Sequence, residues 1–279
     1  MNILITGAGG FIGTHLYNHL EKKHDITRIF SSNQSSGEKN GYSVDLTKRT
    51  EVENLTQDLS TTRFDAVIHL ASKMTSPESI EDMSILKENV NMIDNMVLML
   101  KRLKPEVVIH FSSMAVYPNT SGLFYEDSLP MPQKNLDCLY GFSKLTSEVI
   151  LDFLLRKEYI RLVHLRVAQV YGEGMRQDRI IPVMCKELEE KNTITVYGNG
   201  ERQSCFIEIN KLVEKVDYFM QNKLDGVYNV GDENISYFDL AEKIIEQFGN
   251  NESTIIRNAQ GNKEKFNLDT SKLLKTMNT

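Results

Sequence analysis

The sequence is poor in cysteine, glycine and proline, and these shortages exclude several classes of protein. Its 279 residues include 16 Gly and 6 Pro, too few for a collagen-like or low-complexity chain. Only three cysteines occur, Cys138, Cys185 and Cys205, and none has a Cys or His partner at the spacing of a zinc site. We therefore expect free thiols in a reducing compartment and no bound metal.

The chain also lacks an excess of basic residues and any long apolar run. Its 32 Lys and Arg against 38 Asp and Glu leave a net charge of −6, whereas nucleic-acid binders show clustered Lys and Arg. No apolar run approaches the ~18 residues of a membrane span. Residues 1–7 are too few, and have no basic leader, for a signal peptide. The sequence predicts a soluble cytoplasmic protein with no nucleic-acid or membrane partner.

Short apolar runs alternate with longer amphipathic stretches through the first half of the chain. Apolar runs predict strands at residues 2–6, 26–30, 42–46, 64–71, 107–111 and 161–166. Helical periodicity covers residues 11–20, 85–103 and 140–156. Apolar runs of about four to eight residues separated by helical patterns favour βαβ units and a parallel sheet. We predict an α/β fold of the Rossmann type, a doubly wound parallel sheet with helices on both faces.

The second half of the chain is less regular. Its clear patterns are helices at 180–191 and 210–221, a strand at 193–197, and a helix after the capping-box residues Ser236 and Asp239. No Pro/Gly-rich linker separates the two halves. We expect a first domain of residues 1–171 and a smaller α/β C-terminal lobe of residues 172–279, with some segments of the lobe returning to the first domain.

Three evenly spaced glycines lie between the first strand and the first helix. Gly7, Gly10 and Gly13 form a GxxGxxG pattern within TGAGGFIG. Glycine there permits a tight turn, lets the backbone approach a pyrophosphate and allows close packing of helix on strand. The helix N-terminus offers free N–H groups and a positive dipole to phosphates. Because the motif follows a strand and opens a helix, it predicts a dinucleotide-binding site.

The end of the second strand bears on which dinucleotide binds. An NAD-binding unit usually carries a carboxylate there for the ribose 2′-OH. This chain has Ser31 and Ser32 at that place, and Arg28 is the nearest base. The two serines could accommodate a 2′-phosphate. We favour NADP as the cofactor, and NAD stays open.

A tyrosine and a lysine four residues apart begin the helix predicted at 140–156. Tyr140 and Lys144 share one helical face, and a nearby ammonium lowers the pKa of a phenol from ~10 towards neutrality. Tyr140 could then exchange a proton with a substrate. Ser112 and Ser113 follow the fifth strand, where a serine can hydrogen-bond the reacting oxygen. Taken alone, these pairs are also typical of a solvated helix face and a strand-end turn.

These motifs occur in one order with several others. The further segments are Asp45-Leu46, His69-Leu70-Ala71, Asn89-Val90, SSMAVY from Ser112, YGFSK from Tyr140, Tyr197-Gly198-Asn199-Gly200, Tyr228-Asn229-Val230-Gly231 and Asp269-Thr270-Ser271-Lys272. The ordered set covers nearly the whole chain. It resembles the extended short-chain dehydrogenase/reductase family, in the NAD-dependent epimerase/dehydratase group that acts on nucleotide sugars.

The resemblance implies roles for individual residues. The expected cofactor contacts are Gly7, Gly10, Phe11, Ile12, Gly13, Asp45, Leu46, Leu70, Ala71, Asn89 and Lys144, beside Ser31 and Ser32. The expected catalytic residues are Ser113, Tyr140 and Lys144. The expected substrate contacts are Ser113, Tyr140 and Arg202, and the second lobe would bind the nucleoside diphosphate of the substrate.

Three departures from the family pattern narrow these expectations. Met114 and Ala115 stand where dehydratases carry an Asp-Glu pair, which argues against dehydration. Ser204 and Cys205 stand where an Arg-Asp pair often meets the substrate phosphate, so we assign that contact to Arg202. The chain ends soon after residue 272, from which we expect a reduced second lobe and a more open substrate pocket.

The sequence leaves two classes of function open. The first is an NAD(P)-dependent oxidoreductase acting on a nucleotide-activated sugar, as a 4-ketoreductase or 4-epimerase, with Tyr140 as acid/base. The absent carboxylate after the second strand favours the reductase. The alternative is a non-catalytic NAD(P)-binding sensor or scaffold protein on the same fold. Family members commonly dimerise through the helix bearing Tyr140 and its neighbour, so we expect a homodimer with the stretch Met92–Met99 at the interface.

Overall fold

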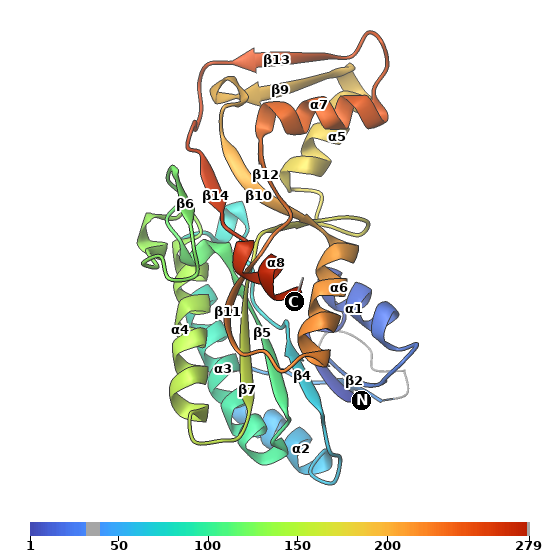
Figure 1. The fold of residues 1–279 in the computed structure, drawn as a ribbon, viewed down its shortest axis with the longest axis vertical. Helices are drawn as coiled ribbons and strands as arrows, with labels where there is room; N and C mark the ends of the chain where they lie inside the picture. Colours follow the sequence, from blue (N-terminus) through green and yellow to red (C-terminus); the bar gives the residue numbers. More distant parts are fainter. Residues whose placement is uncertain (32–39, 278–279) are drawn as a thin grey trace.

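A parallel sheet of seven strands forms the body of the molecule (Figure 1). The computed structural model describes residues 1–31 and 40–277. In spatial order the strands are β11 (Gly226–Val230), β7 (Arg161–Val167), β5 (Val107–Ser113), β4 (Ala66–His69), β1 (Asn2–Thr6), β2 (Asp25–Phe30) and β3 (Gly41–Ser43). Each neighbouring pair is parallel. The α/β fold of the Rossmann type is therefore confirmed.

Alternate side chains of the strands enter two separate cores. Ile3 and Ile5 of β1 belong to one core, and Leu4 belongs to the other. The helices of the first core are α1 (Phe11–Leu20) and α6 (Ile209–Gln221), and those of the second are α2 (Arg49–Asp58), α3 (Ser84–Leu103) and α4 (Cys138–Leu155). Figure 1 shows α3 and α4 on one side of the sheet and α1 and α6 on the other. Because successive side chains of a strand point to opposite faces, a sheet covered on both faces needs nearly continuous apolar strands.

Two strands are shorter than the apolar runs that predicted them. β3 ends at Ser43, and shortly beyond it the N–H of Asp45 bonds to the Glu51 carboxylate (2.8 Å) instead of to a neighbouring strand. β4 ends at His69, and the apolar residues that follow it line a cleft. The residues that follow β3 and β4, which are Asp45, Leu46, Leu70 and Ala71, therefore line the cleft and do not extend the sheet.

The methionines of α3 are core residues. Met92, Met96 and Met99 are buried in the core that α3 shares with α4. Their burial leaves them little surface for contact with another copy of the chain, contrary to the expectation from the sequence. The exposed large apolar side chains on α4 are Phe142, Val149 and Phe153.

Three small sheets and further helices form the C-terminal part. Their strands pair as β12 (Glu233–Ser236), β10 (Gln203–Glu208) and β8 (Gln169–Tyr171), as β13 (Thr254–Asn258) with β9 (Thr193–Tyr197), and as β14 (Phe266–Leu268) with β6 (Gly122–Phe124). Helices α5 (Ile180–Lys191) and α7 (Tyr237–Phe248) bury apolar side chains against these strands. The predicted cap of α7 is present, since the N–H of Asp239 donates to Ser236 Oγ (3.0 Å).

Some elements beyond residue 171 belong to the body of the molecule. β11 is the edge strand beside β7, α6 packs against α1, and α8 (Ser271–Met277) packs beside β11. The C-terminal half thus supplies part of the large sheet and one of its covering helices. The functional division into residues 1–171 and residues 172–279 stays a prediction.

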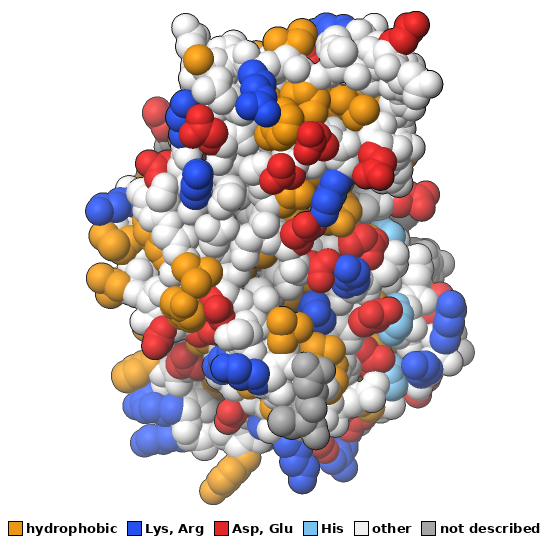
Figure 2. All heavy atoms as spheres, turned by 45° about the horizontal axis from the view of Figure 1, so that its top comes forward, with side chains coloured by type: hydrophobic (Ala, Val, Ile, Leu, Met, Phe, Trp, Pro, Cys, Tyr) orange, Lys and Arg blue, Asp and Glu red, His pale blue; other side chains and the backbone are white. Residues whose placement is uncertain are grey.

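The described surface carries charges of both signs. On the face in Figure 2, acidic and basic side chains lie interspersed. Within residues 1–31 and 40–277, no helix is long and apolar enough to cross a membrane. In the same ranges, no three His, Cys, Asp or Glu side chains gather as a metal ion would require, and the three cysteines are unpaired.

Candidate active site

A cleft of about 880 Å³ opens at the carboxyl ends of the parallel strands. It is lined by the segments that follow β1, β4 and β5 and, from the C-terminal part, by Arg202, Phe206 and Tyr237. All strands of a parallel sheet end at the same edge, which is where ligands of open α/β sheets bind. The volume lies in the range of sites for cofactors and other small molecules.

The glycine turn forms part of this cleft and fits a pyrophosphate. Gly7 has a φ of +69°, and a Cβ on it would lie 2.8 Å from the backbone N of Ala71. A Cβ on Gly13 would collide with the carbonyl oxygen of Gly7. Residues 10–13 line the cleft, and Gly10 caps α1 without a side chain. The free N–H groups of the first turn of α1 are therefore available to an anion in the cleft.

We expect Gly13→Ala to weaken dinucleotide binding at least about tenfold and to destabilise the fold by about 1–3 kcal/mol. The new methyl would press on Gly7 and Ala8 and push the turn towards the cofactor. Isothermal titration with NAD(H) and NADP(H), together with urea unfolding, measures both effects. Thr14→Ala on the same helix is the control, because the Thr14 side chain is exposed and does not line the cleft. Equal dinucleotide affinity in wild type and Gly13→Ala would contradict this account of the turn.

The end of β2 supplies one of the two serines predicted there. Ser31 lines the cleft, and Ser32 lies outside the described residues. Arg28 is not among the residues that line the cleft, because its guanidinium stacks on the ring of Tyr17, 3.7 Å from the centroid. The nearest base in the sequence therefore points away from the site.

The segment after β3 brings a carboxylate to the cleft. Asp45 and Leu46 both line it. Burial pushes the pKa of Asp45 up, but hydrogen bonds from the N–H (3.0 Å) and hydroxyl (2.6 Å) of Thr47 outweigh burial, and the pKa lies below its usual value. Asp45 is therefore ionised at neutral pH.

Asn89 lies behind the cleft wall. Leu70 and Ala71 line the cleft as expected, whereas Asn89 is buried on α3 and is not part of the lining. Its Oδ1 accepts the N–H of Lys73 (2.7 Å), and its Nδ2 donates to the Lys73 carbonyl (3.0 Å) and to Ser143 Oγ (3.0 Å). Asn89 thus holds the loop after β4 against α4.

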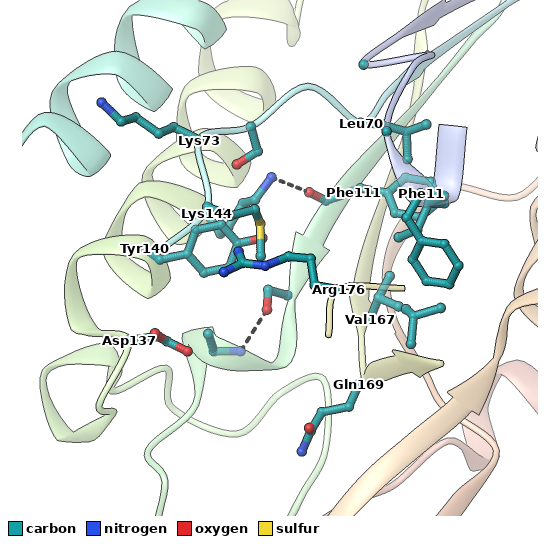
Figure 3. A pocket seen from close by; sticks show the side chains of 18 of the residues that line it. Phe11, Leu70, Lys73, Phe111, Asp137, Tyr140, Lys144, Val167, Gln169 and Arg176 are labelled. Carbon is teal, nitrogen blue, oxygen red and sulfur yellow. Dashed lines mark hydrogen bonds between the residues drawn. The ribbon is translucent and has the colours of Figure 1, made fainter. Parts of the chain in front are cut away.

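The predicted Ser–Tyr–Lys set is brought together in the cleft, with Ser113 at the end of β5 and with Tyr140 and Lys144 on α4 (Figure 3). Ser113, Tyr140 and Lys144 all line the cleft. Lys144 Nζ lies 5.6 Å from the centroid of the Tyr140 ring and donates to the Phe111 carbonyl (2.8 Å). Burial lowers the pKa of Lys144 to about 8. Ser113 Oγ accepts the N–H of Ala115 (3.1 Å), so its own O–H can turn towards the cleft.

The ionisation of Tyr140 differs from the expectation. Burial raises the pKa of Tyr140 above its ordinary value, although side-chain hydrogen bonds from Ser72 and Ser113 and the charge of Arg179 lower it. The expected fall of this pKa towards neutrality is not found, because loss of hydration outweighs the favourable contacts. The buried phenol is therefore protonated at neutral pH.

Several polar residues of the cleft were not expected from the sequence. Ser72 and Lys73 come from the loop after β4, and Arg176 and Arg179 from the segment before α5. Arg176 Nη1 donates to the carbonyl of Thr75 (3.2 Å), which joins the two segments. The one signal for Ser72 along the chain is that it directly follows the motif ending at Ala71. Arg202 lines the cleft as expected, with its guanidinium 5.1 Å from the Tyr237 ring centroid.

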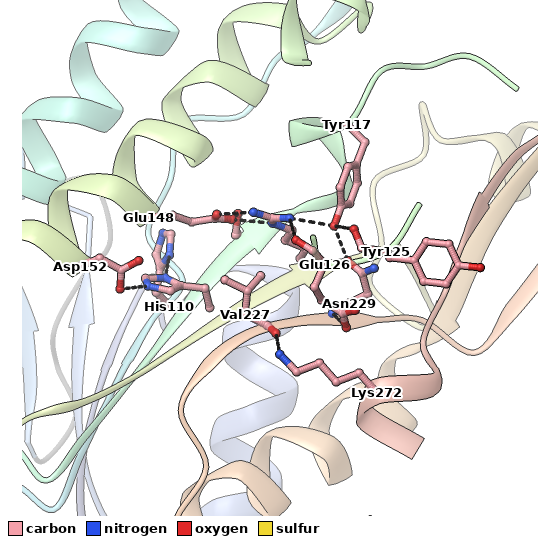
Figure 4. A network of polar contacts seen from close by, with 12 residues as sticks. His110, Tyr117, Tyr125, Glu126, Glu148, Asp152, Val227, Asn229 and Lys272 are labelled. Atoms are coloured by element: carbon pink, nitrogen blue, oxygen red, sulfur yellow. Dashed lines mark hydrogen bonds and ion pairs between the residues drawn. The ribbon is translucent and has the colours of Figure 1, made fainter. Parts of the chain in front are cut away.

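A buried network of one ion pair and several hydrogen bonds connects the strands and the helix that carry the site residues (Figure 4). Arg166 of β7 donates from Nε (3.1 Å) and Nη2 (2.8 Å) to the two carboxylate oxygens of Glu148 on α4. Its Nη1 donates to the Tyr117 hydroxyl (2.8 Å), which in turn donates to Asn229 Oδ1 (2.9 Å). Ser112 lines the cleft, but its hydroxyl donates to Glu148 and so belongs to this network. The network joins β5, β7, β11 and α4.

The sequence match decides the family. Residues 3–231 match the NAD dependent epimerase/dehydratase family. The chain belongs to that family. Its members are NAD-dependent enzymes that modify nucleotide sugars, so the resemblance seen in the ordered motifs is confirmed.

Individual relatives catalyse different reactions. The chain is 26% identical over 271 residues to the dTDP-4-dehydro-6-deoxyglucose reductase of Escherichia coli, covering 91% of this chain and 83% of that protein. It superposes on TunA, an NAD dependent-NDP-hexosamine 5,6-dehydratase involved in tunicamycin biosynthesis, with a TM-score of 0.81 at 25% identity, over 99% of this chain and 91% of that one. The UDP-glucose 4-epimerase of Thermus thermophilus, in complex with NAD, gives a TM-score of 0.80 at 19% identity over 99% and 93% of the two chains. Membership of the family therefore does not specify which reaction this chain catalyses.

Proposed function

We propose that the protein is an NAD(P)-dependent oxidoreductase that acts at C4 of a nucleotide-activated sugar, as a 4-ketoreductase or a 4-epimerase. The observation that carries the proposal is the placing of Ser113, Tyr140 and Lys144 in the same cleft as the glycine turn. The Escherichia coli relative, by its name, is a reductase of a 4-dehydro sugar nucleotide. Met114 and Ala115 offer no carboxylate for elimination of water, which argues against a dehydratase.

A nicotinamide dinucleotide fits the cleft at the glycine turn. Gly7, Gly10 and Gly13 would hold its pyrophosphate on the N-terminus of α1, with Phe11 and Ile12 beside them. Asp45, Leu46, Leu70 and Ala71 would border it, and Lys144 would bind its ribose. When bound, the cofactor supplies or accepts the hydride. We favour NADP because Ser31 lines the cleft at the position where NAD-binding units usually carry a carboxylate. A carboxylate there would repel the 2′-phosphate of NADP, whereas a serine would not.

Tyr140 supplies the proton in this proposal. As a protonated, buried phenol it is ready to act as the acid that protonates the sugar carbonyl oxygen during reduction. Ser113 lies beside it and would hydrogen-bond the same oxygen.

The substrate phosphates need cations from the C-terminal side of the cleft. Arg202 is our proposed phosphate contact, as the resemblance implied. Arg176 and Arg179 line the same cleft and both lie within ion-pair distance of Asp178, so the three side chains carry one net positive charge. Guanidinium groups suit phosphates because they donate two parallel hydrogen bonds.

The experiment that tests the proposal is a substrate screen. Purified protein is mixed with NADPH or NADH and with UDP-, dTDP-, GDP- or CDP-linked 4-keto sugars, and absorbance at 340 nm is followed. We expect consumption of the reduced cofactor with at least one sugar. Interconversion of 4-epimers with bound NAD and no consumption would favour the epimerase. Cofactor binding with neither reaction would favour the alternative, a non-catalytic sensor or scaffold protein.

We also propose a homodimer that contacts through α4. Val149 and Phe153 of α4 are each 59% exposed and lie four residues apart on one helical face. Light scattering should give twice the chain mass of 32.0 kDa, and Val149→Glu with Phe153→Glu should give the monomer. A monomeric wild type would overturn this proposal. The cytoplasmic location expected from the sequence stays a prediction.

A further inference from the structure

Residues 173–176 connect two parts of the cleft wall that lie far apart along the chain. They belong to the segment between β8 and α5, in the C-terminal part of the molecule. At one end of this stretch, His15 Nε2 of α1 donates to the Glu173 carbonyl (2.9 Å). At the other end, Arg176 Nη1 donates to the carbonyl of Thr75 (3.2 Å), in the loop after β4. We call residues 173–176 the bridge.

Further contacts fix both ends of the bridge. Gly174 lies beside the first turn of α1, since a Cβ on Gly174 would be 3.8 Å from the ring of Phe11. Thr75 is buried, and its hydroxyl donates to Asp137 Oδ1 (2.7 Å) directly before α4. The bridge therefore ends on two well-held parts of the molecule, the start of α1 and the junction of the loop with α4.

The bridge and the edge of the sheet together form a closed ring. β1 leads through the glycine turn to α1, and β4 leads to the loop that holds Thr75. β1 and β4 are neighbours in the sheet, and at their ends the Thr6 hydroxyl lies 2.8 Å from His69 Nδ1. The glycine turn, the loop after β4, and Met175 and Arg176 of the bridge all line the same cleft. The ring therefore surrounds a part of that cleft.

The ring stands between the two ends of the proposed cofactor site. The sheet order β5, β4, β1, β2, β3 places Asp45 and Leu46, which follow β3, on one side of the ring. Lys144 lies on the other side, where it donates to the Phe111 carbonyl of β5. A dinucleotide that borders Asp45 and reaches Lys144 with its ribose must cross the ends of β1 and β4. It therefore passes between these strand ends and the bridge.

We propose that the bridge retains the bound dinucleotide, and that one of its two ends must open for the dinucleotide to enter or leave. This inference rests on the cofactor site of the proposed function. It gives His15 and Arg176 a role in cofactor exchange. In a 4-ketoreductase the cofactor is exchanged in each turnover, so the bridge opens once in each catalytic cycle. In an epimerase the bridge stays closed over bound NAD.

The strength of the two contacts sets the size of the expected effect. The net contribution of one hydrogen bond within a protein corresponds to about a two- to tenfold change in an equilibrium. Loss of the bond at either end should therefore raise the population of the open bridge by about that factor. Because both bonds join protein to protein, entry and exit of the dinucleotide should be accelerated equally, which leaves Kd unchanged.

The test measures kon and koff of NADPH and NADH by stopped-flow fluorescence. Both acceptors are backbone carbonyls, so the donors are changed. His15→Phe removes one donor and keeps the edge-on contact with the Phe11 ring (5.4 Å between centroids), and Arg176→Met removes the other donor. His19→Phe is the matched control, because His19 is also on α1, pairs with Asp217 (3.5 Å) and does not line the cleft. Thermal unfolding confirms that each variant is folded.

For His15→Phe we expect kon and koff both to rise about three- to tenfold, with Kd changed less than about twofold. Arg176→Met should raise koff by a similar factor. The double variant should release the dinucleotide at most about twofold faster than the faster single variant, because one open end already breaks the ring. His19→Phe should match wild type.

Three results would overturn the role of the bridge. The first is a wild-type koff in both single variants, and the second is a rise in koff for His15→Phe without a rise in kon. The third is a double variant in which the two single effects multiply, since the two ends would then act independently. A wild-type protein that binds neither NADPH nor NADH would instead overturn the cofactor site of the proposed function.

Discussion

Replacing Tyr140 with phenylalanine is expected to lower kcat by about 10²- to 10⁴-fold while leaving dinucleotide affinity within about threefold of wild type. The phenylalanine ring keeps the packing of Tyr140 against Ile85 and Ala115 and loses only the hydroxyl. Steady-state kinetics with the best substrate of the screen, and titration with the cofactor, separate the two effects. Tyr159→Phe is the control, because the Tyr159 side chain is fully exposed and does not line the cleft.

Two results would contradict this expectation. A kcat for Tyr140→Phe within about threefold of wild type would remove Tyr140 from the proton transfer. Loss of dinucleotide binding together with activity would show that the hydroxyl holds the cofactor or the fold instead. Neither result is compatible with an acid that acts only during reaction.

Replacing Arg166 with methionine is expected to destabilise the protein by about 3–5 kcal/mol, because the Glu148 carboxylate is left buried without its partner. The side chains of Arg166 and Glu148 are each 5% exposed. Burial opposes the charge on Arg166, but the hydrogen bonds and charge of Glu148 outweigh burial and raise the Arg166 pKa. The guanidinium is therefore charged in the fold at all accessible pH.

Chemical denaturation of matched variants measures this effect. Arg63→Met removes a pair of similar length (2.7 Å) whose side chains are 80% and 59% exposed, and should cost less than about 1 kcal/mol. Combining Arg166→Met with Glu148→Met should recover much of the loss, since no unpaired charge remains. If Arg166→Met costs no more than Arg63→Met, the network does not support the site as described.

The sequence was sufficient to predict those features that depend on residues close together along the chain. The glycine turn follows from three glycines between one strand and one helix, and the spacing of Tyr140 and Lys144 places both on one helical face. The parallel sheet follows in the same way from the alternation of apolar runs and helical patterns. These features need no knowledge of which distant segments meet.

The sequence was insufficient to predict those features that depend on contacts between residues far apart along the chain. Helix α2 escaped prediction because only a few of its residues, such as Val52 and Leu55, are apolar and buried. Ser72 and Arg179 come from separate loops and reach Tyr140 only in the folded chain. The pKa of Tyr140 was expected to fall, because the nearby Lys144 could be read from the spacing whereas complete burial of the phenol could not.

The measurement that tests the central claim most directly is the transfer of deuterium from the cofactor to the sugar. Enzyme, NADPH or NADH deuterated at the transferred position, and a nucleotide-linked 4-keto sugar are incubated together, and the sugar is analysed by mass spectrometry and NMR. The account predicts one deuterium at C4 of the sugar, incorporated at least about 100-fold more slowly by Tyr140→Phe. Sugar recovered without deuterium, from enzyme shown to have the cofactor bound, would contradict it.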